Sequence, residues 1–116
     1  MIKILHNNSC SKSRTVLEYL DENDVKFEII DFIENPLSKM EIQTVLKKLN
    51  CNPKKIIRFH DTEFQELNLN IDALSDEQII DLLCEHPQLL QRPILIKGKI
   101  AMVGRPIENV KYFIGK

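Results

Sequence analysis

The sequence has few cysteines and no long hydrophobic run, and each shortage excludes a class of protein. Its three cysteines, Cys10, Cys51 and Cys84, are odd in number and far apart. This pattern argues against a disulfide framework and favours a reducing compartment, the cytoplasm. The sequence has no Cys-x-x-Cys pair or Cys/His cluster, so we expect no bound metal. No stretch approaches the roughly 18 apolar residues of a membrane helix, and no secretory signal is visible, so we expect no membrane association.

An excess of charge of either sign is also missing. The formal net charge is −1, and acidic and basic residues are interspersed along the chain. This pattern predicts no nucleic-acid partner. A length of 116 residues suits one core, so we expect a single domain spanning residues 1–116. We also expect a monomer.

The first third of the chain alternates between strand and helix signals. Residues 2–6 form a short apolar run that predicts a buried strand. Val16, Leu17 and Leu20 follow with the spacing of a helix packed on that strand, and residues 25–32 are β-branched and aromatic enough for a second strand. Two strands joined by a helix predict a parallel pair.

The middle of the chain is helical. Ser38 with Glu41, and Ser75 with Gln78, have the spacing of capping boxes, each of which predicts the start of a helix. Residues 53–68 give weaker signals and predict short helical turns. The expected buried stripes are Ile42, Val45, Leu46 and Leu49 in the first helix, and Ile79, Leu82 and Leu83 in the second.

Strand signals return after Pro93. Residues 94–96 and 100–103 flank a turn that contains Gly98, which predicts a β-hairpin, and Pro106 then marks the start of a helix with Val110 and Phe113 on its apolar face. The sum is an α/β fold of β-α-β, a helical insertion at about residues 38–90, then β-β-α. This order is typical of the thioredoxin-like architecture, with a mixed sheet and the insertion between strands 2 and 3.

Cys10 is the candidate nucleophile. It lies where the first strand gives way to the first helix, in the segment His6-Asn7-Asn8-Ser9-Cys10-Ser11. Free backbone N–H groups and the helix dipole at a helix N-terminus stabilise a thiolate over a thiol. The position therefore predicts an activated cysteine.

The arginines form the second informative pattern. Only four are present, Arg14, Arg58, Arg92 and Arg105, against twelve lysines, and two of them precede proline. A guanidinium group binds tetrahedral oxyanions through a planar fork of donors, which a lysine ammonium cannot reproduce. Together with a thiol at a helix N-terminus, these arginines predict a thiolate beside an oxyanion pocket.

Taken together, these motifs resemble the glutaredoxin-coupled arsenate reductase family over essentially the whole chain. The resemblance is carried, in order, by His6-Asn7-x-x-Cys10, Ser13-Arg14, Glu34-Asn35-Pro36, Arg58, His86-Pro87, Arg92-Pro93 and Gly104-Arg105-Pro106.

The resemblance implies a role for each matched residue. Cys10 would attack the arsenic of arsenate to form a thioarsenate that is then reduced to arsenite, and His6 would tune its thiol. Arg58, Arg92 and Arg105 would hold the anion. Pro93 would be the cis-proline that precedes the third strand. Glutathione would be the co-substrate and glutaredoxin the electron donor, with no bound cofactor.

Two alternative functions stay open at this point. Spx-type regulators share the fold and bind RNA polymerase, but they sense redox state through a Cys-x-x-Cys pair, and here the second position is Ser13. The other alternative is a thiol reductase acting on another oxyanion or on a glutathione mixed disulfide. Cys51 and Cys84 are expected to be structural or incidental rather than resolving thiols.

Overall fold

The computed structural model describes residues 1–6 and 11–115, with side chains for 1–6 and 14–115. The chain divides into two compact units. We call residues 1–35 and 92–116 the sheet unit, and residues 36–91 the insertion unit. The insertion unit enters the chain between the second and third strands, which confirms the predicted helical insertion.

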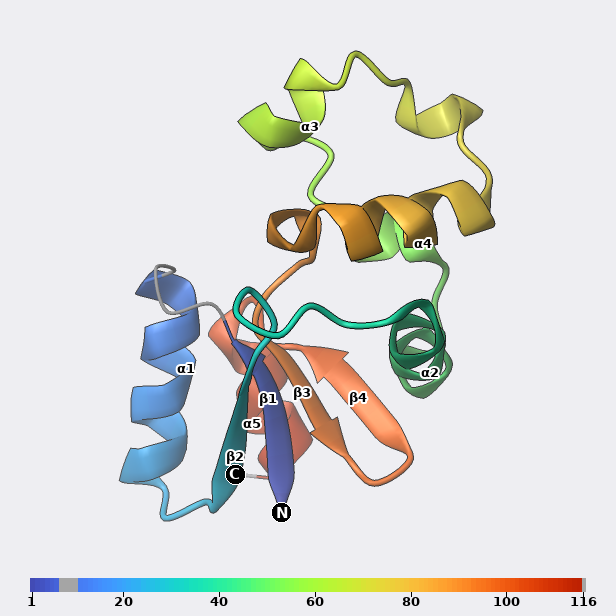
Figure 1. The fold of residues 1–116 in the computed structure, drawn as a ribbon. Helices are drawn as coiled ribbons and strands as arrows, with labels where there is room; N and C mark the ends of the chain where they lie inside the picture. Colours follow the sequence, from blue (N-terminus) through green and yellow to red (C-terminus); the bar gives the residue numbers. More distant parts are fainter. Residues whose placement is uncertain (7–10, 116) are drawn as a thin grey trace. The chain divides into compact units, whose positions relative to one another are not determined.

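The sheet unit contains a four-stranded mixed sheet (Figure 1). Its strands are β1 (Ile2–His6), β2 (Phe27–Asp31), β3 (Ile94–Lys97) and β4 (Ile100–Val103), in the spatial order β2-β1-β3-β4. β1 is parallel to β2 and antiparallel to β3, and β3 and β4 form the predicted hairpin. The predicted fold class is confirmed.

The second strand is shorter than the predicted range of 25–32. Val25 is excluded because its N–H donates to the carbonyl of Leu20 at 3.0 Å, closing the end of the first helix. Asp24 makes that closure with a left-handed φ of 56°. At the other end, Phe32 belongs to the turn that follows Asp31. Turns therefore set both ends of β2, and the strand propensity of the residues alone does not predict them.

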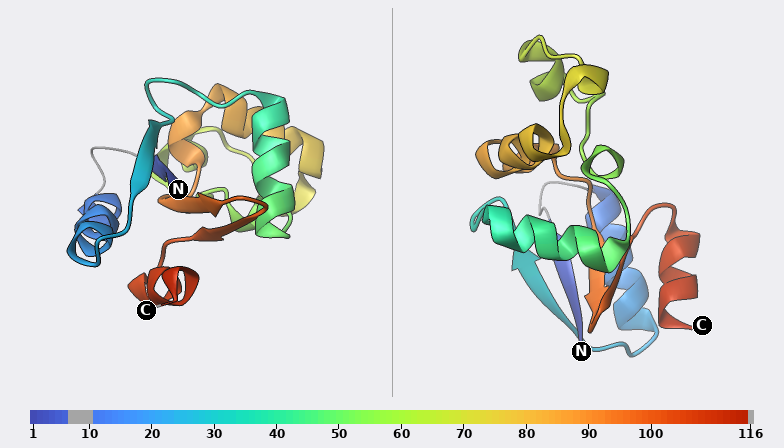
Figure 2. Two further views of the ribbon diagram at one scale, coloured as in Figure 1. Left: turned by 90° about the horizontal axis from the view of Figure 1, so that it is seen from below. Right: turned by 90° about the vertical axis from the view of Figure 1, so that its right-hand side faces the viewer.

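Two helices cover one face of the sheet, α1 (Ser11–Glu22) and α5 (Ile107–Ile114) (Figure 2). Burial on this face follows the period of each element, because alternate strand residues and one helical stripe point inward. The buried cluster consists of Ile2, Ile4, Val16, Leu20, Leu95 and Val110. Phe113 packs against this cluster but is only partly buried.

The insertion unit is built on α2 (Lys39–Leu49) and α4 (Asp76–Glu85), which pack against each other. Both predicted capping boxes are present. The Ser38 hydroxyl accepts from the N–H of Glu41 at 3.2 Å, and the Glu41 carboxylate accepts from the N–H of Ser38 at 3.0 Å. Ser75 and Gln78 repeat this exchange at 3.2 and 2.8 Å.

The buried stripe of α4 differs from the predicted one. It consists of Ile79, Ile80 and Leu83, and the prediction of Leu82 was wrong because that side chain is only half-buried. Leu82 instead lines a shallow surface hollow together with Leu69 and Leu74. In α2 the stripe of Ile42, Val45 and Leu46 is buried as predicted, with Leu49 half-buried at its end.

Short helical turns fill the segment between α2 and α4, as predicted. They are α3 (Thr62–Glu66) and 3-10 turns at Pro53–Lys55 and Ile71–Ala73, and a further 3-10 turn, Pro87–Leu89, follows α4. An isolated antiparallel bridge pairs Ile57 with Leu90. Among the described residues no helix is long and apolar enough to cross a membrane.

Candidate active site

Three of the predicted site residues lie at one end of the sheet. β1 ends at His6, and because β3 runs antiparallel to it, Leu5 pairs with Ile94 at the start of β3. Ile94 also pairs with Val103, the last residue of β4. The sheet therefore brings His6, Arg92 and Arg105 to the same end, where each lies one or two residues beyond these pairs.

The helix predicted next to Cys10 is also present. α1 begins at Ser11, the residue that follows Cys10 in the sequence. Cys10 itself lies outside the described residues, so its place in the site remains a prediction. The structure confirms only that a helix starts at this point of the chain, as the argument for a thiolate requires.

Arg92 and His6 are the most enclosed of the site residues. Arg92 is 9% exposed and His6 is 1% exposed. A guanidinium group in such surroundings interacts more strongly with an anion than a solvated one does, because less water screens the charge. The peptide bond from Arg92 to Pro93 is cis, as the family resemblance implied. The bond from Arg105 to Pro106 is also cis, and the sequence did not predict it.

Gly104 fits the connection after β4 tightly against Pro93. Its N–H donates to the Pro93 carbonyl at 2.8 Å. A Cβ at this position would lie 2.8 Å from Leu95 Cδ1 and 2.9 Å from Pro93 Cγ, closer than real Cβ atoms come. Any larger residue would therefore force these neighbours to move, whereas glycine permits the close approach that sets the backbone of Arg105 beside the Arg92-Pro93 segment.

Asn109 fixes the same connection from α5. Its side-chain amide donates to the carbonyl of Val103 at 3.1 Å and to that of Arg105 at 2.8 Å. Both carbonyls precede α5, so a single side chain ties down the backbone on either side of Gly104. Sequence reasoning missed this residue, although its position four residues after Arg105 on a predicted helix was a usable signal.

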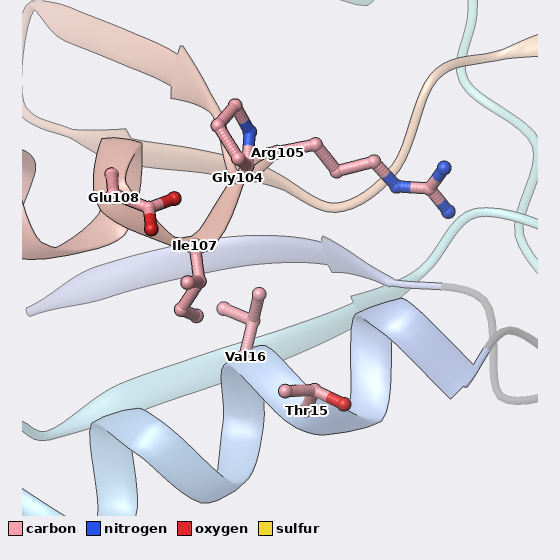
Figure 3. A pocket seen from close by; sticks show the side chains of 7 residues that line it. Thr15, Val16, Gly104, Arg105, Ile107 and Glu108 are labelled. Carbon is pink, nitrogen blue, oxygen red and sulfur yellow. The ribbon is translucent and has the colours of Figure 1, made fainter.

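A cavity of about 560 Å³ opens between α1 and this connection (Figure 3). Val16, Pro106 and Ile107 give it apolar walls, and it is also lined by Thr15, Gly104, Arg105 and Glu108. The Arg105 side chain extends away from Val16 and Ile107, toward the end of α1 at which that helix begins. All of the lining residues belong to the sheet unit.

Arg58, the remaining predicted anion ligand, belongs to the insertion unit. It follows the bridge residue Ile57, and its N–H donates to the Leu89 carbonyl at 2.7 Å. Its guanidinium Nη2 lies 3.5 Å from a carboxylate oxygen of Asp61, and both side chains are about three-quarters buried, at 24% and 28% exposure. The Asp61 carboxylate also caps α3 by accepting from the N–H of Glu63 at 2.9 Å. The structure thus brings together His6, Arg92 and Arg105 and describes Arg58 in the other unit.

Cys51 and Cys84 have surroundings that disfavour a thiolate. Burial raises the pKa of Cys51, and nearby Lys55 lowers it in part. Burial also raises the pKa of Cys84, and the neighbouring Asp81 carboxylate raises it further. Both cysteines are free thiols in the insertion unit. Within the described ranges, no group of three or more His, Cys, Asp or Glu side chains gathers as a metal site would require.

The sheet order and the flanking helices define a thioredoxin-like α/β protein, with His6, Arg92 and Arg105 at one end of its sheet. The chain belongs to the ArsC family, whose model matches residues 5–113.

Relatives in this family carry three different names. The chain is 36% identical over 115 residues to the uncharacterized protein YfgD of Escherichia coli, a match that covers 98% of this chain and 97% of that one. It is 34% identical over 111 residues to an arsenate reductase of Neisseria meningitidis, covering 95% of each chain. It is also 30% identical over 114 residues to the global transcriptional regulator Spx of Listeria innocua, covering 98% of this chain and 87% of the regulator.

The fold also matches solved structures over nearly the whole chain. The arsenate reductase from Vibrio cholerae superimposes with a TM-score of 0.89 at 33% sequence identity, over 96% of this chain and 95% of that one. The topology described above is therefore that of ArsC-family structures.

Proposed function

We propose that the chain is an arsenate reductase that uses glutathione and glutaredoxin, with Cys10 as its nucleophile. The observation that carries the proposal is the gathering of His6, Arg92 and Arg105 at the sheet end next to which α1 begins. Membership of the ArsC family and the relatives named arsenate reductase support it.

In the proposed reaction, the Cys10 thiolate attacks the arsenic of arsenate. A sulfur–arsenic bond forms, an arsenic–oxygen bond breaks, and the departing oxygen takes up protons and leaves as water. Two glutathione thiols then transfer two electrons to As(V) and become one disulfide. Water cleaves the remaining sulfur–arsenic(III) bond, which releases arsenite and returns the Cys10 thiol. Glutaredoxin would carry reducing equivalents to the reduction step, and glutathione would be consumed as co-substrate.

The arginines would make the first step feasible. An anionic nucleophile must approach a largely dianionic oxyanion, so donors must neutralise the oxygens as charge moves. Arg92 and Arg105 would supply them, with Arg58 as the third guanidinium that the family resemblance implies. His6, buried at the end of β1, would tune the Cys10 thiol.

A coupled assay tests the proposal. It follows NADPH oxidation in the presence of glutathione, glutaredoxin and glutathione reductase, with and without arsenate. We expect turnover that depends on arsenate and disappears in Cys10→Ser. Cys10-dependent NADPH oxidation with a glutathione mixed disulfide added in place of arsenate, and none with arsenate, would instead identify a reductase of glutathione mixed disulfides.

Matched arginine variants test the anion site. Arg92→Lys and Arg105→Lys keep the charge but lose the planar fork, so we expect turnover to fall by about 10²-fold or more. Lys99→Arg is the control, because it exchanges the same two side chains at an exposed residue of the turn between β3 and β4. Near-full activity in both site variants would contradict the proposal.

A second candidate function rests on the similarity to the Spx regulator. Ser13 removes the Cys-x-x-Cys pair, so the disulfide switch of that class cannot form here. A regulatory function would require that the chain binds RNA polymerase without this switch. Co-purification with the polymerase α subunit, combined with no arsenate turnover, would favour it.

A further inference from the structure

The cavity between α1 and the start of α5 is a feature of the sheet unit that the anion site alone does not explain (Figure 3). Its volume of about 560 Å³ lies within the range of small-ligand pockets, about 300–1,000 Å³. Apolar walls with a few polar groups at the rim are also typical of such pockets. Here the polar groups are Thr15, Arg105 and Glu108.

The charges around the cavity argue against a second oxyanion as its ligand. Glu108 is exposed in the first turn of α5, and none of the ion pairs among the described residues involves it. Its carboxylate would repel arsenate but would attract an ammonium group. Arg105, at the other side of the cavity, would attract a carboxylate. The cavity therefore suits a small molecule that carries both charges.

The cavity also shares a residue with the proposed anion site. It is lined by Arg105, one of the proposed anion ligands, and by Thr15 and Val16 of α1, the helix that begins directly after Cys10. Figure 3 shows Thr15 and Arg105 with their polar ends directed toward the end of α1 at which the helix begins. A ligand in the cavity would thus have the proposed reaction site at one end.

We propose that this cavity binds the thiol co-substrate, a zwitterionic thiol peptide of the glutathione type, with its ammonium group at Glu108 and a carboxylate toward Arg105. This inference rests on the proposed function, which names glutathione as the source of electrons. Glutathione carries one ammonium and two carboxylates at neutral pH, so its charges complement both ends of the cavity. Glu108 would act as a binding residue that selects the reductant without contacting arsenate.

Binding can be measured without turnover by using S-methylglutathione, whose thioether cannot react. Titration of ¹⁵N-labelled full chain should shift the backbone amide signals of Thr15, Gly104, Ile107 and Glu108. Glu108→Gln should weaken binding about tenfold, because the charge-assisted hydrogen bond to the ammonium is lost. Glu108→Lys should weaken it further. Glu18→Gln removes an exposed glutamate of α1 that does not line the cavity, and it should bind as the wild type does.

A modified ligand makes the assignment of the ammonium specific. N-acetyl-S-methylglutathione lacks the ammonium group, so it should bind the wild type about as weakly as S-methylglutathione binds Glu108→Gln. Glu108→Gln should then cause no further loss for the acetylated ligand, since the two changes remove the same interaction. An equal loss with both ligands would overturn the proposal, as would amide shifts confined to other residues or no binding at millimolar concentrations.

Failure of this inference and failure of the proposed function give different results. Binding of S-methylglutathione that depends on Glu108, without arsenate turnover, would remove the arsenate assignment and leave the cavity as a thiol-peptide site. Arsenate turnover whose KM for glutathione is unchanged in Glu108→Gln would leave the enzyme assignment and overturn the cavity assignment.

Discussion

The side-chain amide of Asn109 donates a hydrogen bond of 2.8 Å to the main-chain carbonyl of Arg105. The same amide nitrogen holds the carbonyl of Val103 at 3.1 Å. The residue between these two carbonyls is Gly104, whose own N–H is bonded to Pro93. Arg105 directly follows Gly104 and the end of β4. Its backbone is therefore held by Asn109 of α5 and, through Gly104, by Pro93 before β3.

Removing the Asn109 amide should weaken arsenate binding more than it weakens the fold. Asn109→Ala loses two hydrogen bonds to carbonyls, and we expect the KM for arsenate to rise about tenfold with a smaller change in kcat. Asn23→Ala is the matched control, because it loses a similar bond of 2.8 Å, to the Tyr19 carbonyl at the other end of α1. Steady-state kinetics on both variants measure the effect. An equal change in KM in both would show that Asn109 acts only through stability.

Gly104→Ala should damage both stability and the anion site. The new methyl group would collide with Leu95 and Pro93, and such overpacking costs about 1–3 kcal/mol of unfolding free energy. Gly98→Ala is the control: with a φ of +59° and open space around it, it should cost about 1 kcal/mol through backbone strain alone. Urea unfolding gives the stabilities. We expect only Gly104→Ala to raise the KM for arsenate; an unchanged KM would separate the Gly104 contact from the site.

Asp61→Asn should test whether Arg58 binds the oxyanion. Asparagine keeps the cap on α3 but removes the negative charge 3.5 Å from Arg58, so unfolding free energy should change by no more than about 1 kcal/mol. In the proposed site the carboxylate would compete with arsenate for the guanidinium, so its loss should lower the KM for arsenate about two- to fivefold. Arg58→Ala should raise it. Opposite shifts of KM support the role of Arg58, and no shift in either variant excludes it.

The three thiols should differ in their reaction with iodoacetamide. Burial raises the pKa of Cys51 and of Cys84, so the thiolate fraction of each near neutral pH is smaller than for an ordinary cysteine. Cys10 should have a pKa below about 7.5, as expected for a thiol at a helix N-terminus near cations. Mass spectrometry after brief alkylation at pH 7 should find the label on Cys10 first. Labelling of Cys51 or Cys84 before Cys10 would contradict the activated thiolate.

Local signals were enough to predict most of the fold. The capping boxes at Ser38 and Ser75 and the hairpin around Gly98 depend on neighbours within a few residues, and all three are present. The prediction that Leu82 is buried was wrong because both Leu82 and Ile80 suit a helical stripe. Only the packing of α4 in the insertion unit selects between them. The predicted start of β2 was wrong for a similar reason, because the Val25 N–H bonds to the Leu20 carbonyl at the end of α1 instead of joining the sheet.

The site was less predictable because its supports come from distant parts of the chain. Gly104 meets Pro93 and Leu95 only once β3 and β4 have paired, and no local pattern reports that distance. Asp61 is readable from the sequence as a helix cap, but its approach to Arg58 depends on the fold of the turn between them. Cys10 remains a prediction from its place before α1.

The division of the sheet unit into two chain segments has a consequence for how the protein is made. A ribosome synthesises β1, α1 and β2 first, then the whole insertion unit, and only afterwards the strands that complete the sheet. Until then the edge of β1 that pairs with β3 stays open, and such edges invite pairing with other chains. Arg92 and Arg105 are synthesised with those last strands, so the oxyanion site proposed here cannot form before the sheet can close.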